Sequence, residues 1–206
     1  MPHRCATQGW RPQRTTGEAA MVSSRVARRI DCPAVHGLGP PLADVRQPHR
    51  DRRQLEQDAI YVGGGNTKSA LAVWREWGLD TVLREAWESG VLLAGMSAGA
   101  MCWYEAGLTD SFWGAAYRPL DCLGLLPGGC AVHYSSDPKR RETLHAAQKA
   151  YTVPPSIAID DFAAALYLST SVDSVFSWRE GSTAYQVYRE HETVIETALP
   201  VKRIGR

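Results

Sequence analysis

The sequence predicts an α/β protein whose mostly parallel β-sheet is flanked by helices. Two apolar runs, at 59–62 and 91–95, each end in a glycine-rich turn that is followed by a helical pattern. Short apolar runs are typical of strands buried on both faces of a parallel sheet, and strands that alternate with helices build such sheets. After residue 155 the pattern changes to short alternating segments between turn residues, which predicts hairpins at the C-terminal end.

Composition divides the chain near residue 54. Residues 1–54 hold ten arginines and only seven valine, isoleucine or leucine residues, and their one local pattern is a short basic helix at 22–30. We therefore expect an atypical N-terminal segment over 1–54, irregular or disordered, and one α/β domain over 55–206.

The overall balance of residues is ordinary for a globular domain. The 206 residues are 44% hydrophobic and 22% charged, and the formal net charge is +1. Such a charge gives no reason to expect nucleic acid or an anionic membrane as a partner. Because the chain lacks an apolar run of membrane-spanning length and the apolar core of a signal peptide, we expect a cytoplasmic protein.

The cysteines and glycines indicate neither a metal site nor a cofactor. No cysteine spacing is typical of metal ligands, so we expect no bound metal and reduced, mostly buried thiols at Cys5, Cys32, Cys102, Cys122 and Cys130. The triple glycine at 63–65 lacks the further residues of the nucleotide-binding motifs, so we expect no nucleotide cofactor. Its amides are instead available to an oxyanion.

The helix after the strand at 59–62 is expected to end at Gly78. A second helix is predicted over 80–89, with Asp80 as its N-cap. The later predicted elements are a loop at 107–111, a strand at 130–133, a helix from Asp137 to about 151, and strands at 156–159, 163–168, 174–178, 183–188 and 192–197.

The segment Gly95-Met96-Ser97-Ala98-Gly99 has the Gly-x-Ser-x-Gly pattern of a nucleophile elbow, in which a strand turns sharply into a helix with the serine at the tip. Unpaired amides in the first turn of that helix stabilise negative charge beside the serine. The motif therefore favours acyl transfer. The alternative is that it is only a tight strand-to-helix connection.

A serine nucleophile needs a base and an acidic residue that orients the base. Among the six histidines, only His133 follows a predicted strand of the α/β part, although a lone histidine is more often structural than catalytic. Asp110, Asp160 and Asp161 each follow a predicted loop or strand end. Sequence spacing does not choose among these three carboxylates.

Three motifs together resemble the serine peptidase family of dipeptidase E and cyanophycinase. They are Tyr61-Val62-Gly63-Gly64-Gly65-Asn66-Thr67, Gly95-Met96-Ser97-Ala98-Gly99-Ala100, and His133 after an apolar-Pro-Gly segment. The resemblance covers about residues 57–198. It implies a class I glutamine amidotransferase-like fold in which a serine replaces the amidotransferase cysteine.

The resemblance also assigns roles to residues. It implies that Ser97 is the nucleophile and His133 the general base. The amides of Gly65 and Ala98 would form the oxyanion hole. The acidic residue would be Asp110, in the loop after the elbow helix, or Asp161, at the end of the strand that follows the histidine helix.

The implied activity is hydrolysis of short peptides through an acyl-enzyme, with a small peptide as substrate. Aspartyl dipeptidases hold an acidic side chain with an arginine after the catalytic histidine; Arg140 and Arg141 lie in that segment here, but the surrounding motif is not reproduced. Two other functions stay open. One is an α/β-hydrolase-type esterase, with His191 as its late histidine, and the other is a non-catalytic amidotransferase-like binding module.

The resemblance further implies central strands before the triple glycine, and residues 1–54 lack the aliphatic runs that such strands need. We therefore expect an open edge beside the strand that ends at Val62. Catalysis by this chain is expected to be weakened or absent, unless the N-terminal segment folds in some irregular way or a second copy of the chain, in a homodimer, covers that edge.

Overall fold

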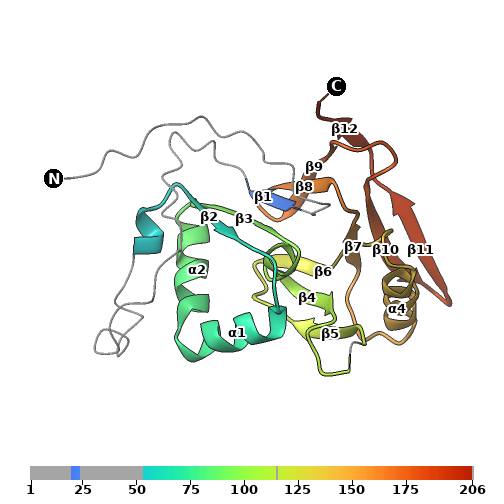
Figure 1. The fold of residues 1–206 in the computed structure, drawn as a ribbon, viewed down its shortest axis with the longest axis horizontal. Helices are drawn as coiled ribbons and strands as arrows, with labels where there is room; N and C mark the ends of the chain where they lie inside the picture. Colours follow the sequence, from blue (N-terminus) through green and yellow to red (C-terminus); the bar gives the residue numbers. More distant parts are fainter. Residues whose placement is uncertain (1–19, 24–52, 115, 206) are drawn as a thin grey trace.

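The computed structural model describes residues 20–23, 53–114 and 116–205. Its strands form two six-stranded sheets, with helices α1 and α2 beside β2 and β3 and helix α4 beside β10 and β11 (Figure 1). Sheets flanked by helices confirm the predicted α/β class.

The first sheet has the order β12-β9-β8-β1-β3-β2, and the second has the order β11-β10-β7-β6-β4-β5. The strands of the first sheet are β12 (Val201–Arg203), β9 (Ser171–Ser177), β8 (Ala163–Leu168), β1 (Ala20–Ser23), β3 (Leu92–Met96) and β2 (Ala59–Val62). Those of the second are β11 (Thr193–Ala198), β10 (Ala184–Glu190), β7 (Ser156–Ile159), β6 (Leu126–Val132), β4 (Tyr104–Thr109) and β5 (Arg118–Asp121). The helices are η2 (Arg53–Glu56, a 3-10 turn), α1 (Thr67–Glu76), α2 (Leu79–Glu88), α3 (Ala98–Met101) and α4 (Pro138–Lys149).

The strand directions combine parallel pairs with hairpins at the C-terminal end, as predicted. β2 is parallel to β3, and β6 is parallel to both of its neighbours, β4 and β7. Antiparallel pairs such as β8–β9 and β10–β11 accompany them. The reason is connection length, because a parallel pair needs a crossover of about a dozen residues or more, which the short C-terminal connections do not supply.

Side-chain caps begin two of the helices. Asn66 caps α1 and Asp137 caps α4, each by accepting a hydrogen bond from a backbone N–H, at 2.9 and 3.0 Å. The prediction that Asp80 caps the second helix is wrong, since Gly78 is the N-cap and Asp80 lies in the first turn. With φ at 69°, Gly78 lets α1 turn directly into α2.

Two other local predictions are wrong because pairing with neighbouring strands decides the conformation. Residues 107–109, predicted as loop, end strand β4, which is paired on both sides by β5 and β6. Val22 and Ser23, predicted as the start of a basic helix, belong to β1, which lies between β3 and β8. Residues 24–30 lie outside the described part of the chain. Among the described residues, the segment 1–54 contributes the inner strand β1, and β2 is the outermost strand of its sheet.

The main apolar core joins the two sheets. Trp103 and Tyr104, directly after α3, are fully buried, and the Tyr104 hydroxyl donates a hydrogen bond to the Tyr167 hydroxyl of β8 at 3.1 Å. The described cysteines are free and buried, as predicted; they are Cys102, Cys122 and Cys130. Cys5 and Cys32 lie outside the described residues.

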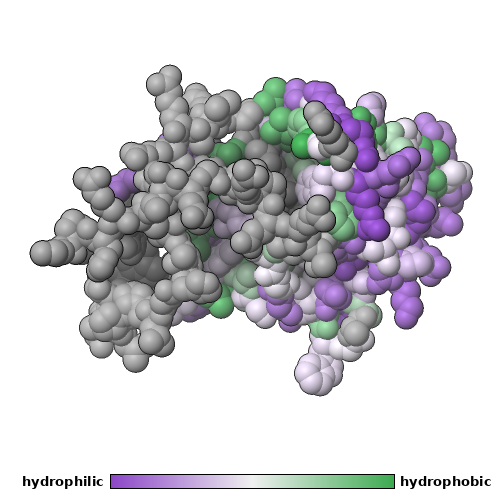
Figure 2. All heavy atoms as spheres, turned by 45° about the horizontal axis from the view of Figure 1, so that its top comes forward, coloured by the Kyte–Doolittle hydropathy of each residue, from purple (hydrophilic) through white to green (hydrophobic). Residues whose placement is uncertain are grey.

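Within the described ranges, no helix is both long and apolar enough to cross a membrane. Those same residues contain no group of three or more side chains able to hold a metal ion. Figure 2 shows hydrophilic residues over much of the surface on the side where Figure 1 places the C-terminal strands. These strands therefore present a solvated outer surface.

The turn that follows β3 packs so closely against β2 that their backbones are in direct contact. A Cβ atom on Gly95 would lie 2.1 Å from the Gly99 carbonyl oxygen, and one on Gly99 would lie 2.1 Å from the Val62 carbonyl oxygen. No side chain fits at either position, so only glycine allows β2, β3 and α3 to meet there.

We predict that Gly99→Ala lowers the free energy of unfolding by about 3 kcal/mol or more, because the rigid Val62 carbonyl cannot move away from the new methyl group. Urea unfolding measures this change. Gly63→Ala is the matched control, since a Cβ there meets nothing within 4 Å. Equal stability of the two variants would contradict the close packing.

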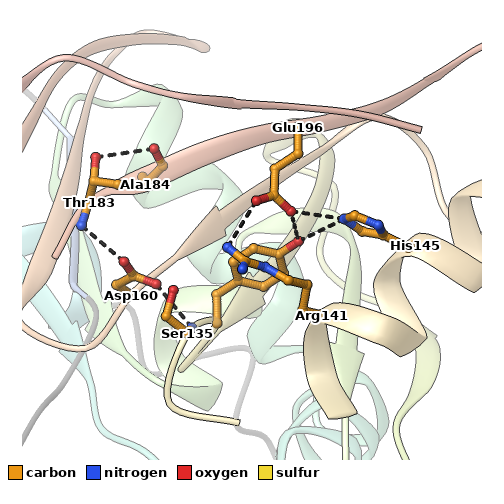
Figure 3. A network of polar contacts seen from close by, with 8 residues as sticks. Ser135, Arg141, His145, Asp160, Thr183, Ala184 and Glu196 are labelled. Atoms are coloured by element: carbon orange, nitrogen blue, oxygen red, sulfur yellow. Dashed lines mark hydrogen bonds and ion pairs between the residues drawn. The ribbon is translucent and has the colours of Figure 1, made fainter. Parts of the chain in front are cut away.

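A polar network anchors helix α4 to strand β11 (Figure 3). The carboxylate of Glu196 lies 2.9 Å from Arg141 Nη2 and 2.8 Å from His145 Nε2. The Tyr134 hydroxyl donates a third bond to Glu196, at 2.5 Å. Partial burial raises the pKa of Glu196, but hydrogen bonds from Tyr134 and His145 and the charge of Arg141 outweigh burial, so the net pKa is lowered.

We predict that Glu196→Gln destabilises the protein more at about pH 5 than at about pH 3. The pKa of Glu196 is lower in the folded protein than in the unfolded chain. The ionised carboxylate therefore stabilises the fold at pH values above the unfolded-state pKa, and this stabilisation is lost as the pH falls through the folded-state pKa. Urea unfolding at both pH values tests this. Glu192→Gln, at a carboxylate that is 94% exposed, is the control and should change stability little at either pH. A Glu196→Gln effect that is the same at both pH values would contradict the prediction.

Candidate active site

Ser97 lies between the end of β3 and the start of α3, with φ at 53° and ψ at −117°. This conformation is rare for a residue with a side chain and is strained by about 1–3 kcal/mol. Glycine at position 64 keeps the space beside Ser97 free, since a Cβ on Gly64 would lie only 3.3 Å from Ser97 Cβ, closer than ordinary van der Waals contact. The geometry is that of a strand–turn–helix elbow with the serine at its tip.

His133 directly follows β6 and is also left-handed, with φ at 56°. Its Nε2 atom lies 3.0 Å from Ser97 Oγ, within hydrogen-bond distance. The two residues are 36 positions apart in sequence, and they meet because each follows the C-terminal end of its strand.

Asp161 completes a chain of contacts from the other side of the imidazole. Its Oδ1 lies 2.5 Å from His133 Nδ1, just beyond the end of β7. The His133 and Asp161 side chains are 28% and 22% exposed, so the contacts are shielded while the site stays open to solvent. Serine, histidine and carboxylate thus stand in the order that nucleophilic catalysis requires.

The other two candidate carboxylates lie elsewhere. Asp110 is exposed at the end of β4, and among the described residues it has no hydrogen bond or ion pair with His133. Asp160 is buried, and its oxygens accept the backbone N–H groups of Ser135 and Thr183. Asp161 is therefore the candidate that the structure brings to the imidazole.

The proposed oxyanion amides belong to two separate turns. Ala98 opens α3, where a first-turn amide has no intrahelical acceptor, and Gly65 lies in the glycine turn after β2 with φ at 154°. Among the described residues, neither amide donates a hydrogen bond.

Sequence reasoning missed a serine that holds the glycine turn in place. Ser111 Oγ accepts the backbone N–H of Thr67 at 2.9 Å, and the Ser111 carbonyl accepts from Asn66 Nδ2 at 3.2 Å. Thr109 Oγ1 lies 2.7 Å from Ser111 Oγ. The loop after β4 thus braces the turn that carries Gly65. No sequence motif indicates this link, because it joins segments more than forty residues apart.

The two arginines considered for an acidic substrate are engaged within the fold. Arg141 pairs with Glu196, as described above. Arg140 is 5% exposed, with its guanidinium carbon 4.3 Å from the centre of the Tyr117 ring. His191, the candidate base for an esterase, is exposed in the turn between β10 and β11, and His133 holds the position beside Ser97.

The buried thiols are poor nucleophiles. Burial raises the pKa of Cys122 to about 12 and raises the pKa values of Cys102 and Cys130 as well. Since the thiolate is the reactive form, these three thiols are not expected to act as nucleophiles.

Comparisons with known proteins agree with this geometry. The model of peptidase family S51 matches residues 31–174. The chain is also 42% identical over 151 residues to a Bacillus subtilis (strain 168) protein described as uncharacterized peptidase YgaJ. That alignment covers 73% of this chain and 65% of the relative, so the chain spans less than two thirds of the relative's length. Because the family model covers more than half of the sequence and includes Ser97, His133 and Asp161, the chain belongs to peptidase family S51.

Proposed function

We propose that this protein is a serine peptidase that hydrolyses short peptides through an acyl-enzyme on Ser97. The observation that carries the proposal is the continuous line of contacts from Ser97 Oγ to His133 and from His133 to Asp161, at 3.0 and 2.5 Å. Membership of a peptidase family supports the same reaction class.

In the proposed first step, Ser97 Oγ attacks the peptide carbonyl carbon while His133 Nε2 takes the hydroxyl proton. Asp161 holds the imidazole in orientation and stabilises the imidazolium that forms. His133 then gives the proton to the departing amine as the peptide C–N bond breaks, leaving an ester on Ser97. Water, deprotonated by His133, then attacks the ester carbonyl carbon, and His133 returns the proton to Ser97 Oγ as the ester C–O bond breaks and the acid leaves.

The negative oxygen of the tetrahedral intermediate would be bound by the amides of Gly65 and Ala98. Ala98 contributes from the first turn of α3, at the positive end of the helix. Gly65 contributes from a turn that Ser111 holds in place. A fixed pair of donors stabilises charge without reorganising during the reaction.

For the substrate we propose dipeptides and other short peptides without a required acidic side chain. Arg140 is buried and Arg141 is paired with Glu196, so neither guanidinium is offered as a free partner for a substrate carboxylate. We further propose that the enzyme acts in the cytoplasm. We also propose a homodimer in which a second copy of the chain covers the edge strand β2.

We predict that Ser97→Ala lowers dipeptide hydrolysis by about 10⁴-fold or more with little change in thermal stability, because the hydroxyl acts in the reaction rather than in packing. Turnover of a dipeptide panel and labelling by a fluorophosphonate probe measure the effect. Ser171→Ala, at an exposed serine of β9, is the control and should retain both. Labelling that persists in folded Ser97→Ala would overturn the assignment. Low turnover in the unaltered chain would match the weakened catalysis expected from residues 1–54.

We predict that Asp161→Asn lowers kcat by about 10³- to 10⁴-fold, since the amide no longer favours the productive imidazole tautomer. Asp110→Asn should change kcat by less than about threefold, because its side chain is exposed and does not contact His133. Steady-state kinetics of the two variants decide between the carboxylates. A collapse of kcat in Asp110→Asn alone would reverse the assignment.

A further inference from the structure

Asp160 lies next to the proposed triad but turns its carboxylate to the backbone. The residue is 3% exposed. Asp160 Oδ1 accepts the Ser135 N–H at 3.0 Å, and Oδ2 accepts the Thr183 N–H at 3.1 Å (Figure 3). Its own N–H donates to the Thr183 carbonyl at 3.0 Å. One side chain therefore joins the segment after β6, the end of β7 and the start of β10.

The segments that Asp160 joins are those that carry the base and the acid. Ser135 is two residues after His133, and Asp161 is the next residue after Asp160. The Tyr134 N–H donates to the Ile159 carbonyl at 3.2 Å, so backbone bonding links the same two segments. The Ser135–Asp160 bond extends this pairing past the end of the strands.

The conformations on both sides need such support. His133 and Phe162 are both left-handed, with φ at 56° and 63°. Residues with side chains keep this conformation only where their surroundings over-determine it. Without the Asp160 carboxylate, the N–H groups of Ser135 and Thr183 lose their acceptors and the two segments are free to relax.

We propose that Asp160 is a positioning residue that sets the separation of the His133 imidazole from the Asp161 carboxylate, and through it the contact of His133 with Ser97. This inference rests on the proposed peptidase mechanism. A displacement of about 1 Å at the reacting groups lowers the rate by about a hundredfold, so a loosened loop should be visible in kcat.

The test compares Asp160→Ala and Asp160→Asn with Gln148→Ala. Gln148 is the matched control because it is 2% exposed and also clamps β7, but at its other end, where Nε2 donates to the Pro154 carbonyl and to Ser156 Oγ. Asp160→Asn keeps one acceptor oxygen and serves as the test where Asp160→Ala fails to fold. All variants are measured for melting temperature, kcat and KM.

For the Asp160 variants we expect kcat to fall by about 10- to 100-fold with KM changed less than about threefold. Gln148→Ala should lower the melting temperature and leave kcat in place. The proposal would be overturned if folded Asp160 variants had unchanged kcat, or if Gln148→Ala lowered kcat as much as they do.

A second readout does not depend on peptidase activity. A proton held between His133 Nδ1 and Asp161 should give a low-field proton NMR resonance, which can be recorded in the Ser97→Ala background. We expect Asp160→Asn to shift or broaden this signal and Gln148→Ala to preserve it. An unchanged signal would refute the positioning role even if no peptide were hydrolysed, whereas a changed signal without turnover in the unaltered chain would refute only the proposed function.

Discussion

The backbone contact between the elbow and strand β2 is the constraint on which the rest of the site depends. Gly99 packs against the Val62 carbonyl so closely that a methyl group would lie 2.1 Å from its oxygen. This contact sets the turn at Ser97 beside the glycine turn that follows β2. It therefore brings the serine and the two proposed oxyanion amides to one place, before any side-chain interaction contributes.

A second layer of interactions holds the histidine against this turn. The left-handed conformation of His133 is held from both sides, because Asp160 binds the main chain after it while Asp161 contacts its imidazole. Helix α4 is fastened in turn to β11 through Glu196. The strained positions thus lie in the turns, and the interactions that support them come from the regular elements around those turns.

The features that could be predicted from sequence are those encoded by contiguous residues. The elbow was predictable because the glycines and the serine that the sharp turn needs, Gly95, Ser97 and Gly99, lie within five consecutive positions. Apolar runs located β2 and β3 within a residue of their ends, and Asp137 marked the start of α4. His133 was identifiable because it follows a strand in the same alternating pattern.

Sequence by itself therefore determined the fold class, the elbow and the histidine, since each depends on local periodicity or on local backbone geometry. Only the tertiary structure decided which carboxylate reaches the imidazole. Asp160 and Asp161 are adjacent and identical in chemistry, yet one accepts backbone N–H groups and the other contacts His133. The same is true of β1, whose pairing depends on strands distant in sequence. Partners of this kind are fixed by register and by the direction of each side chain, which the packed sheets set and no local pattern records.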